Sequence, residues 1–334
     1  MRLKRYIFLS ILLIAAVGGL VYLKTDTTYT VEILGIPVTL PIAVWVVLPM
    51  FLMFLASFFH MAYYSFINYM KLKRYKKDYD TLVTSFAHAL LREPKNWHYK
   101  TREAKNLGHI TDKSHLIPQD FRIDTKDERL KKPLEYVKDI QNGIYVEIEG
   151  FELSPKNPLL VQNLQNRLKK EPTFSGVILK KCQDYPKDLC QKALEIYMDF
   201  SDISKIKEYA SVFTFETLLK LIDKAAQKRE HVHYQDLLYI VQEAKMELGQ
   251  KEYIELAKKI KNIMAPDDRL RFFELLKEKD ERSEAGYVYT LLDLEMVDKA
   301  RDFLETTNEE ELQNFKAYLE LKDCGKNYPL DLFA

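Results

Sequence analysis

Two long runs without charged residues constrain the first seventy positions of the chain. Tyr6 to Leu23 contains no Asp, Glu, Lys or Arg, and Val38 to Met70 contains none over thirty-three residues. About twenty apolar residues cross the hydrocarbon core of a bilayer as a helix. The first run therefore suffices for one membrane span, and the second exceeds the need of one span. We expect a two-helix membrane anchor, residues 1–77, with a short loop between its spans.

Aromatic side chains indicate where the second run leaves the hydrocarbon. Trp45 lies near its start, and Tyr63, Tyr64 and Tyr69 lie toward its end. Such amphipathic rings favour the headgroup layer of a bilayer. We expect one helix that leaves the hydrocarbon near His60 or Tyr63 and continues through the interface.

A cluster of cations follows the second run and sets the expected topology. Its members are Lys71, Lys73, Arg74, Lys76 and Lys77. Cations that flank a span stay on the cytoplasmic side, and Arg2, Lys4 and Arg5 flank the first run in the same way. We therefore expect a bacterial inner-membrane protein with both termini in the cytoplasm and the loop 24–40 outside. We also expect the cluster to attract anionic lipid, at about 1 kcal/mol per nearby cation before screening.

A cleaved signal peptide is the alternative for residues 1–23. The apolar run is long for such a peptide, and no A-x-A site closes it. The second run keeps its expected direction in either case.

Three local features belong to this anchor. The stretch TYTVEILGIPVTLP alternates apolar and polar residues around Gly35, which predicts a small external β-hairpin or an extended edge. Pro49 removes a backbone donor inside the second run, where it could kink the helix. Ala15 and Gly19 form a small-xxx-small pair that could let two helices approach closely.

Residues 78–157 follow as a juxtamembrane region of mixed character. Helical spacing continues from residue 78 to about 110 and is interrupted by REPKNW. The segment from Ile110 to Pro133 is polar and lacks a period, which predicts a long loop or linker. GIYVEIEGFELSP, residues 143–155, reads as a strand. One or two strands cannot form a sheet unaided, so we expect this stretch to pack along helices or to pair with a partner.

Residues 158–334 predict a helical array domain. Apolar residues recur at i, i+3, i+4 and i+7 in three sets: Phe215, Leu218, Leu219, Ile222 and Ala225; Leu237, Val241, Ala244 and Leu248; and Tyr253, Leu256, Ala257 and Ile260. GYVYTLLDLEMVDKARDFLE is similar to a tetratricopeptide helix pair. Equivalent residues are 46 and 43 positions apart, however, so no tetratricopeptide period survives. The expected fold is mainly α, with a two-span transmembrane hairpin and a cytoplasmic, irregular α-solenoid. Gly325 should follow the last helix, and NYPLDLFA should dock as an extended tail.

The segment YTVEILGIPVTLPIAVWVVLPMFLMFLASFF resembles the membrane hairpin of the lipopolysaccharide assembly protein A family. The match is carried by Tyr29 to Ile33, by Leu40-Pro41 and by the Lys71 to Lys77 cluster. It covers roughly residues 1 to 90. This resemblance implies a two-span inner-membrane protein with a basic cytoplasmic helix. It transfers no catalytic residue.

The helical array is loosely similar to a partner family, lipopolysaccharide assembly protein B. That family places tetratricopeptide repeats behind a single span and ends in a zinc module with paired cysteines. This chain has no such pairs, so metal binding is not carried over. Together the two resemblances imply an anchor joined to a docking region that scaffolds or regulates envelope assembly.

Few residues suggest catalytic or metal chemistry. His60 is the readily titratable side chain inside the second run, and intramembrane ionisable residues are functional suspects. Its place near the cytoplasmic interface favours a structural role. His231 and His233 precede a predicted helix, whereas a zinc site needs three or four ligands, so we interpret them as part of a helix start. We predict no catalytic residue, no metal and no cofactor.

The three cysteines, Cys182, Cys190 and Cys324, form no CxxC pair. Neither a disulfide framework nor a four-thiolate zinc site is expected from this spacing. Free thiols in a reducing compartment are the prediction.

These observations favour a non-catalytic scaffold whose partners are the lipid bilayer and a cytoplasmic or membrane protein. A membrane-bound enzyme with an unrecognised site between the helices remains the alternative function. Nucleic acid is not an expected partner, because a juxtamembrane cation row with only Tyr75 beside it is no stacking platform. A transporter subunit would require oligomerisation, since His60 and Asn68 are the notable polar groups of the spans. A homo-oligomer is left open.

Overall fold

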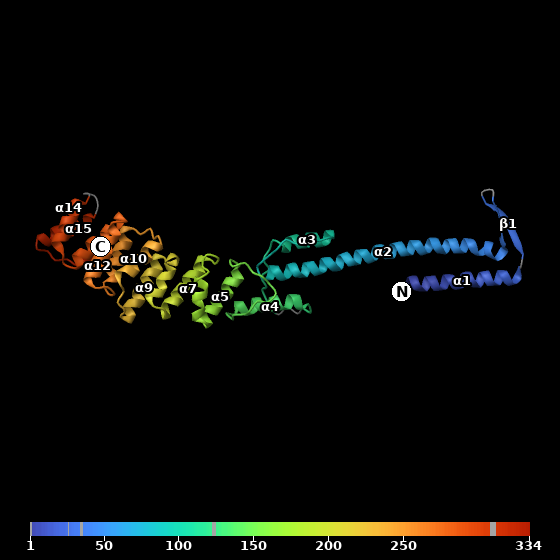
Figure 1. Cartoon of the computed structure of the whole chain (residues 1–334), viewed down its shortest axis with the longest axis horizontal. Helices are drawn as coiled ribbons and strands as arrows, with labels where there is room; N and C mark the ends of the chain where they lie inside the picture. Colours follow the sequence, from blue (N-terminus) through green and yellow to red (C-terminus); the bar gives the residue numbers. More distant parts are fainter. Residues whose placement is uncertain (1, 26, 34–35, 122–124, 308–311) are drawn as a thin grey trace. The chain divides into compact units, whose positions relative to one another are not determined.

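The computed structural model describes residues 2–25, 27–33, 36–121, 125–307 and 312–334 (Figure 1). The described chain is mainly helical, as the sequence predicts, with fifteen α-helices and one two-stranded sheet. It divides into two compact units. Unit 1 comprises residues 1–89, 94–117 and 127–130, and unit 2 comprises residues 90–93, 118–126 and 131–334.

Unit 1 begins with two helices joined by a β-hairpin. Helix α1 (Arg2–Lys24) leads to strands β1 (Thr28–Ile33) and β2 (Ile36–Pro41), which pair antiparallel with Val31 opposite Val38. The predicted hairpin is thus confirmed, although its turn at Gly35 lies outside the described residues. Both α1 and the following helix α2 (Ile42–Leu90) are long and apolar enough to cross a membrane.

Helix α1 packs against the first part of α2. The rings of Tyr6 and Phe54 stack with their centroids 6.0 Å apart. A Cβ atom at Gly18 would lie 3.0 Å from Cγ2 of Val47, whereas one at Gly19 would meet nothing within 4 Å. The close approach within this hairpin therefore uses Gly18. The predicted pair of Ala15 and Gly19 lies on the exposed side of α1.

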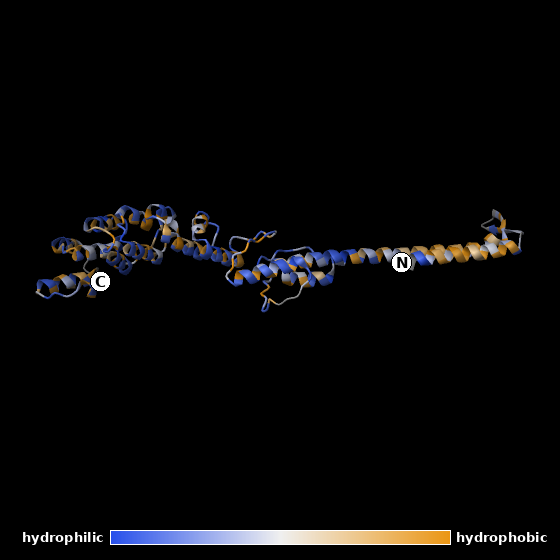
Figure 2. Cartoon of the chain, turned by 90° about the horizontal axis from the view of Figure 1, so that it is seen from below, coloured by the Kyte–Doolittle hydropathy of each residue, from blue (hydrophilic) through white to orange (hydrophobic). Residues whose placement is uncertain are grey.

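Helix α2 is one element of 49 residues. At 1.5 Å per residue it is about 73 Å long, more than twice the thickness of a hydrocarbon core. Pro49 lies within it, and the helix continues on both sides. Figure 2 shows its first part coloured as hydrophobic and its last part as hydrophilic.

Helix α3 (Arg102–Thr111) folds back onto the polar end of α2, so the predicted helical region from 78 to 110 is two helices. Asp78 on α2 accepts hydrogen bonds from the backbone N–H groups of Lys100 and Thr101, at 2.9 and 2.6 Å, and from the Thr101 hydroxyl. These donors lie at the start of α3, where helical N–H groups lack partners. The Asp78 carboxylate therefore caps α3.

A second buried carboxylate fixes the other end of α3. Asp112 accepts hydrogen bonds from the Ser85 hydroxyl and the Tyr99 hydroxyl, both at 2.8 Å, and from the Trp97 N–H at 3.1 Å. Tyr99 also lies over Gly108, where a Cβ atom would come within 2.1 Å of its ring. Along α2, Asp78 contacts the start of α3, and Ser85, seven residues later, contacts Asp112 at the end of α3. Helix α3 therefore runs parallel to α2.

Unit 2 contains most of α4 (Glu128–Gln141), which starts inside the predicted polar linker and includes Pro133. The remaining α-helices are α5 (Pro158–Lys170), α6 (Ser175–Leu179), α7 (Lys187–Phe200), α8 (Ile203–Ile206), α9 (Phe215–Lys228), α10 (Tyr234–Glu243), α11 (Gln250–Ile260), α12 (Pro266–Lys277), α13 (Glu284–Asp293), α14 (Val297–Thr306) and α15 (Gln313–Asp323). Short 3-10 turns join several of them: η1 (Pro172–Phe174), η2 (Lys207–Val212), η3 (Glu281–Ser283) and η4 (Leu330–Leu332).

The predicted strand at residues 143–155 does not form, which corrects the sequence interpretation. The segment is extended and lies along α5, where side-chain amides take the place of a neighbouring strand. Asn163 accepts a hydrogen bond from the Val146 N–H at 3.0 Å and donates to its carbonyl oxygen at 2.8 Å. Asn166 donates to the carbonyl oxygens of Ile140 and Ile144. The expected packing along a helix is confirmed.

A continuous apolar core runs through α5 to α15. Most of the periodic positions predicted from the sequence are buried in it, including Leu218, Leu237, Tyr253 and Leu256. Phe215, Leu219 and Ala244 are half-buried. Helices α12 and α13 approach closely at Gly286, where a Cβ atom would lie 2.4 Å from the Phe273 ring.

The C-terminal tail docks on α13, as expected. Gly325 follows the last helix with φ +76°, a left-handed conformation that glycine adopts without cost. Tyr289 on α13 donates a hydrogen bond to Asp331 at 3.0 Å, and Lys258 pairs with the same carboxylate at 3.4 Å. The tail is not wholly extended, because it includes the turn η4.

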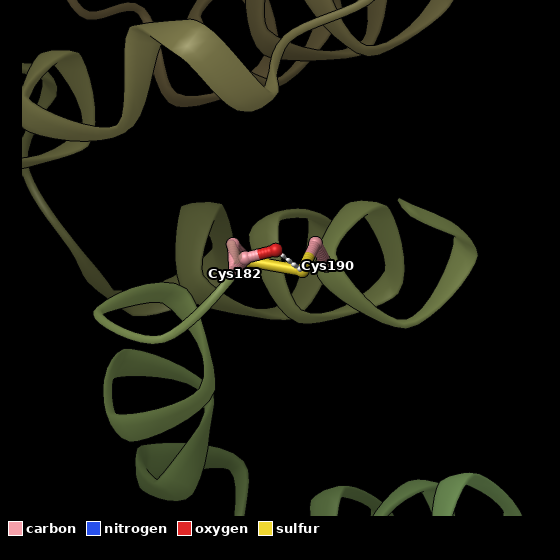
Figure 3. The surroundings of a disulfide bond; sticks show 2 residues. All are labelled: Cys182 and Cys190. Carbon is pink, nitrogen blue, oxygen red and sulfur yellow. Dashed lines mark hydrogen bonds between the residues drawn. A yellow bond between two sulfur atoms is a disulfide. The ribbon is translucent and has the colours of Figure 1, made fainter. Parts of the chain in front are cut away.

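The prediction of free thiols is wrong for two of the three cysteines. Cys182 and Cys190 form a disulfide with their Cα atoms 5.7 Å apart (Figure 3). The turn after α6 brings Cys182 beside the first turn of α7, which the spacing in the sequence does not reveal. Cys324 is exposed and free.

Candidate membrane anchor and basic collar

Helix α2 carries the aromatic and basic side chains that the sequence predicts at the two membrane interfaces of the second span. Trp45 lies in its first turn, and His60, Tyr63 and Tyr64 follow near its middle. The cations Lys71, Lys73, Arg74, Lys76 and Lys77 come next, and we call these five residues the basic collar. From Trp45 to Tyr63 the helix rises about 27 Å. This distance is close to the thickness of a hydrocarbon core, about 30 Å.

Trp45 also joins the β-hairpin to α2. Its indole N–H donates a hydrogen bond of 3.1 Å to the carbonyl oxygen of Tyr29 on β1. This bond satisfies the one polar hydrogen of the side chain, and Trp45 is half-buried. A tryptophan satisfied in this way can sit where an apolar and a polar medium meet.

The aromatic belt at the other end consists of exposed rings. The ring of Tyr64 lies 4.7 Å from that of His60 and 5.7 Å from that of Tyr63. His60 also lines a shallow hollow with Tyr6 and Met61, together with Ala56 and Ser57. His60 is exposed and lies beside apolar and hydroxyl-bearing residues at the level where α1 begins, and its structural role stays a prediction.

All five members of the basic collar are exposed. Asp78, directly after it, is buried and turned toward the start of α3. Asp80 pairs instead with Arg129, at 3.1 Å. Among the described residues, no ion pair joins a collar cation to a carboxylate. The acidic residues nearest the collar therefore leave it uncompensated.

The hydrogen bonds at Asp78 set its protonation. Burial alone would raise the pKa of this carboxyl group, but the Thr101 hydroxyl and the N–H groups of Lys100 and Thr101 more than offset that effect. The pKa of Asp78 is therefore lowered, and the group is ionised at neutral pH. The carboxylate and the positive start of α3 stabilise each other.

The sequence interpretation missed an apolar stripe beside the collar. Leu72, Tyr75 and Tyr79 are 70%, 49% and 57% exposed, and their positions fall in the sector of α2 that the five cations leave free. Spacings of three and four residues connect them, which is the signal that could have found them. The interleaved cations hide this spacing in the printed sequence.

The remaining candidates lie apart from this region. His231 and His233 are exposed, and His233 directly precedes α10, as the helix-start interpretation predicts. Over the described residues, no group of three or more His, Cys, Asp or Glu side chains could hold a metal ion.

Comparisons with protein-family models, with curated proteins and with solved structures find no match to this chain. The anchor, the collar and the array must therefore be interpreted from their own geometry.

Proposed function

We propose that this chain is a two-span inner-membrane protein that holds a non-catalytic, protein-binding helical array at the cytoplasmic face. The observation that carries the proposal is the continuity of α2. One helix runs from the apolar run through the basic collar to the segment that folds back as α3. The same helix that would cross the bilayer therefore leads the chain out of it toward the array.

The exposure of large apolar side chains supports insertion in lipid. Leu12 on α1 and Leu52, Met53 and Phe59 on α2 are all exposed. They belong to runs that lack charge, and the paired helices bury little of them. A contiguous apolar surface of this extent is unstable in water and marks a membrane or a protein interface. A bilayer would cover this apolar surface on all sides. The backbone groups of both helices are hydrogen-bonded within each helix, so the hydrocarbon leaves none of them unsatisfied.

The cations support the direction of insertion. The N-terminal cations precede the apolar run of α1, and the basic collar follows the apolar run of α2. Both sets therefore belong on one side of the membrane, and such cations are retained in the cytoplasm. The β-hairpin then lies outside, with Trp45 at the outer interface. The aromatic belt of Tyr63 and Tyr64 lies at the inner interface.

The array supports a binding role. Its irregular helices pack around one core, and helical arrays commonly bind proteins, an argument by analogy with fold. The resemblance of the anchor to the lipopolysaccharide assembly protein A family supplies the hypothesis that the partner acts in envelope assembly.

Protease accessibility tests the anchor and its direction. Sealed right-side-out and inside-out membrane vesicles are treated with protease, and fragments of the full chain are identified by mass. We expect the array to be digested only in inside-out vesicles. Digestion of the array from the outer face would overturn the topology, and recovery of the whole chain in the soluble fraction would overturn the anchor.

Replacing the collar tests what sets that direction. Changing all five cations to Gln removes the retained charge, so we expect a larger fraction of inverted chains. Changing the four lysines to Arg keeps the charge and serves as the matched control. An unchanged orientation in the Gln variant would exclude the collar as the determinant.

The binding role needs a separate experiment. The full chain is purified in mild detergent, and proteins that accompany it are compared with those that accompany an unrelated tagged inner-membrane protein. We expect specific enrichment of a cytoplasmic or membrane protein. Turnover of a substrate by the purified chain without such enrichment would favour an enzyme instead.

A further inference from the structure

The disulfide of unit 2 borders a hollow in the surface of the array. Cys182 and Cys190 both line this hollow, which has a volume of about 350 Å³. Polar side chains line much of the rest, among them Gln183, Gln191 and Ser211. A small molecule dissolved in water can therefore reach the bridge.

The fold itself places the two sulfur atoms side by side. The turn after α6 is closed by its own backbone, because the Cys182 N–H donates to the carbonyl oxygen of Leu179 at 3.3 Å. The first turn of α7 is closed in the same way, because the Cys190 N–H donates to the carbonyl oxygen of Pro186 at 3.3 Å. Leu179 and Leu189 anchor the two turns in the apolar core. None of these contacts needs the bond between the sulfurs, so that bond can open and close in place.

The surroundings also suit the reduced pair. In Figure 3 the carbonyl group of Cys182 points toward Cys190, and its oxygen lies 3.7 Å from Sγ of Cys190. A thiol at Cys190 therefore has an acceptor in place for its S–H group. Because a buried polar group costs stability unless it has a partner, this acceptor helps the fold to hold the dithiol as well as the disulfide.

The two cysteines differ in their access to solvent. Cys182 is half-buried, whereas Cys190 is 2% exposed. Access is one of the factors that decide which sulfur of a pair reacts. A reagent that enters the hollow therefore meets Cys182 first, and Cys190 is its buried partner.

We infer that Cys182 and Cys190 are a redox pair, which closes to the disulfide when the chain meets a peroxide and is reopened by a small thiol. The resting state of the pair rests on the proposed function, because a cytoplasmic location keeps thiols reduced. The chemistry of the pair does not depend on that location. The structure shows the closed form.

Closing consumes one molecule of hydrogen peroxide. The Cys182 thiolate attacks one peroxide oxygen, the O–O bond breaks, and hydroxide leaves. Cys182 is then a sulfenic acid. The Cys190 thiolate attacks the sulfur of this acid, the S–O bond breaks, and a second hydroxide leaves. The two hydroxides take up the two protons that the thiols released, so two thiols and one peroxide give one disulfide and two molecules of water.

Opening consumes two molecules of a small thiol such as glutathione. The thiolate of the first attacks Sγ of Cys182, the S–S bond breaks, and Cys190 leaves as a thiolate. The thiolate of the second attacks the small-molecule sulfur of this mixed disulfide and releases Cys182. The two protein thiolates take up the protons that the small thiols lost. The small thiol is oxidised to its own disulfide, and the protein disulfide is reduced.

Trapping of the sulfenic acid tests the two roles. The full chain is purified in detergent, reduced, and treated with hydrogen peroxide and dimedone, which captures sulfenic acids. In Cys190→Ser the acid at Cys182 has no internal thiol to react with, so we expect its dimedone adduct to rise at least about tenfold over the wild type. Cys182→Ser is the matched control, and its buried Cys190 should stay a thiol. Equal adducts at the two positions would overturn the assigned roles.

Glutathione buffers test the placement of the sulfurs without any variant. Folding favours the bridge by the same factor by which the bridge stabilises the fold. We therefore expect the folded wild-type chain to form the bridge about thirtyfold or more in preference to the same chain in urea, at one glutathione ratio. Equal bridge formation in the two conditions would overturn the claim that the fold places the sulfurs.

The state of the pair in cells separates this inference from the proposed function. Thiols of the full chain are alkylated in growing cells, after a brief exposure to hydrogen peroxide, and after recovery. We expect thiols, then the disulfide, then thiols again, with Cys324 outside the bridge throughout. Thiols at all three times would overturn the redox pair and leave the location intact. A disulfide at all three times would overturn the proposed location instead.

Discussion

The two units differ in how they use buried polar and exposed apolar side chains. In unit 1, buried Asp78, Ser85 and Asp112 hold α3 to α2, while large apolar side chains of α1 and α2 stay exposed. In unit 2, a broad apolar core is buried and most charged pairs lie at the surface. Water drives apolar burial in unit 2. The reverse pattern in the apolar part of unit 1 fits a region surrounded by lipid, where apolar exposure costs nothing.

The largest expected effect comes from removing a buried ion pair in unit 2, that of Arg269 and Asp293. The Arg269 side chain is 4% exposed, and it donates to Asp293 at 2.7 Å. Replacing Asp293 with Asn leaves the guanidinium buried without a counter-charge, so we expect the free energy of unfolding of unit 2 to fall by about 3–5 kcal/mol. Chemical denaturation of the full chain in detergent, followed by circular dichroism, measures it.

The control for this variant is Asp323→Asn. Asp323 pairs with Arg301 at 2.8 Å in an exposed position, where such pairs contribute about 1 kcal/mol or less. Comparable losses in the two variants would contradict the role assigned to burial.

The second effect concerns the disulfide between Cys182 and Cys190, which are separated by eight positions in the sequence. Chain entropy predicts that reduction destabilises unit 2 by about 2–3 kcal/mol for a loop of this length. Replacing both Cys182 and Cys190 with Ser should reproduce the loss, and replacing the free, exposed Cys324 should not. Thermal unfolding with and without reductant measures it, and a stability unaffected by reductant would refute the prediction.

The same pair tests the compartment. The structure joins Cys182 and Cys190 as a disulfide, whereas the cytoplasm is reducing, so the proposed location predicts that this disulfide is reduced in growing cells and forms only under oxidising conditions. Alkylation of intact cells before lysis, followed by peptide mass measurement, reports their state. A fully oxidised pair in cells would place unit 2 in an oxidising compartment and contradict the topology.

The third effect is a loss of local stability in unit 1 at acid pH, where Asp78 becomes protonated. The pKa of Asp78 is lowered although burial opposes this, because the Thr101 hydroxyl and two N–H groups bind the carboxylate. A lowered pKa in the folded state gives stability that is present above the unfolded value, about 3.9, and is lost as pH falls through the folded pKa. We expect the amides of Lys100 and Thr101 to lose protection from hydrogen exchange only in that acid range.

Asp78→Asn tests this assignment at neutral pH. Hydrogen bonds to a charged group contribute about 1.5–3 kcal/mol, so the variant should expose the same amides without acid. The amides of α11 and α13 in unit 2 serve as the internal control. Unchanged exchange at Lys100 and Thr101 would show that α3 is held mainly by Asp112.

Periodic features of the fold could be predicted from the sequence, and contacts between distant residues could not. The two apolar runs, the β-hairpin and the helices around Leu218 and Tyr253 follow from local spacing. The fold-back of α3 depends on Asp78 meeting residues 22 and 23 positions away, and no local pattern indicates it. GIYVEIEGFELSP has the composition of a strand, yet Asn163 satisfies its backbone from a helix.

The candidate site shows the same limit. The cations and the aromatic belts could be predicted from the sequence because the charge and hydropathy of each residue are known without its contacts. The apolar stripe of Leu72, Tyr75 and Tyr79 was missed because charged residues separate each of its members from the next, so only the count along a continuous helix reveals it. The length of α2 beyond the apolar run is what makes that count meaningful.

The smallest expected effect is a difference between collar cations in how strongly each attracts anionic lipid, according to its position along α2. Lys71 lies six residues nearer the apolar run than Lys77, about 9 Å along the helix, which is roughly one Debye length at physiological ionic strength. If each cation close to an anionic surface contributes about 1 kcal/mol, Lys71→Gln should reduce the enrichment of anionic lipid around the protein by up to about fivefold. Lys77→Gln should reduce it much less, because the field at that distance is largely screened. Native mass spectrometry of the lipids that each purified variant retains measures the difference. Equal losses from the two variants would mean that the helix tilts enough to bring both cations to the headgroups, and the apolar stripe of Leu72, Tyr75 and Tyr79 would then lie closer to the lipid than a perpendicular helix allows.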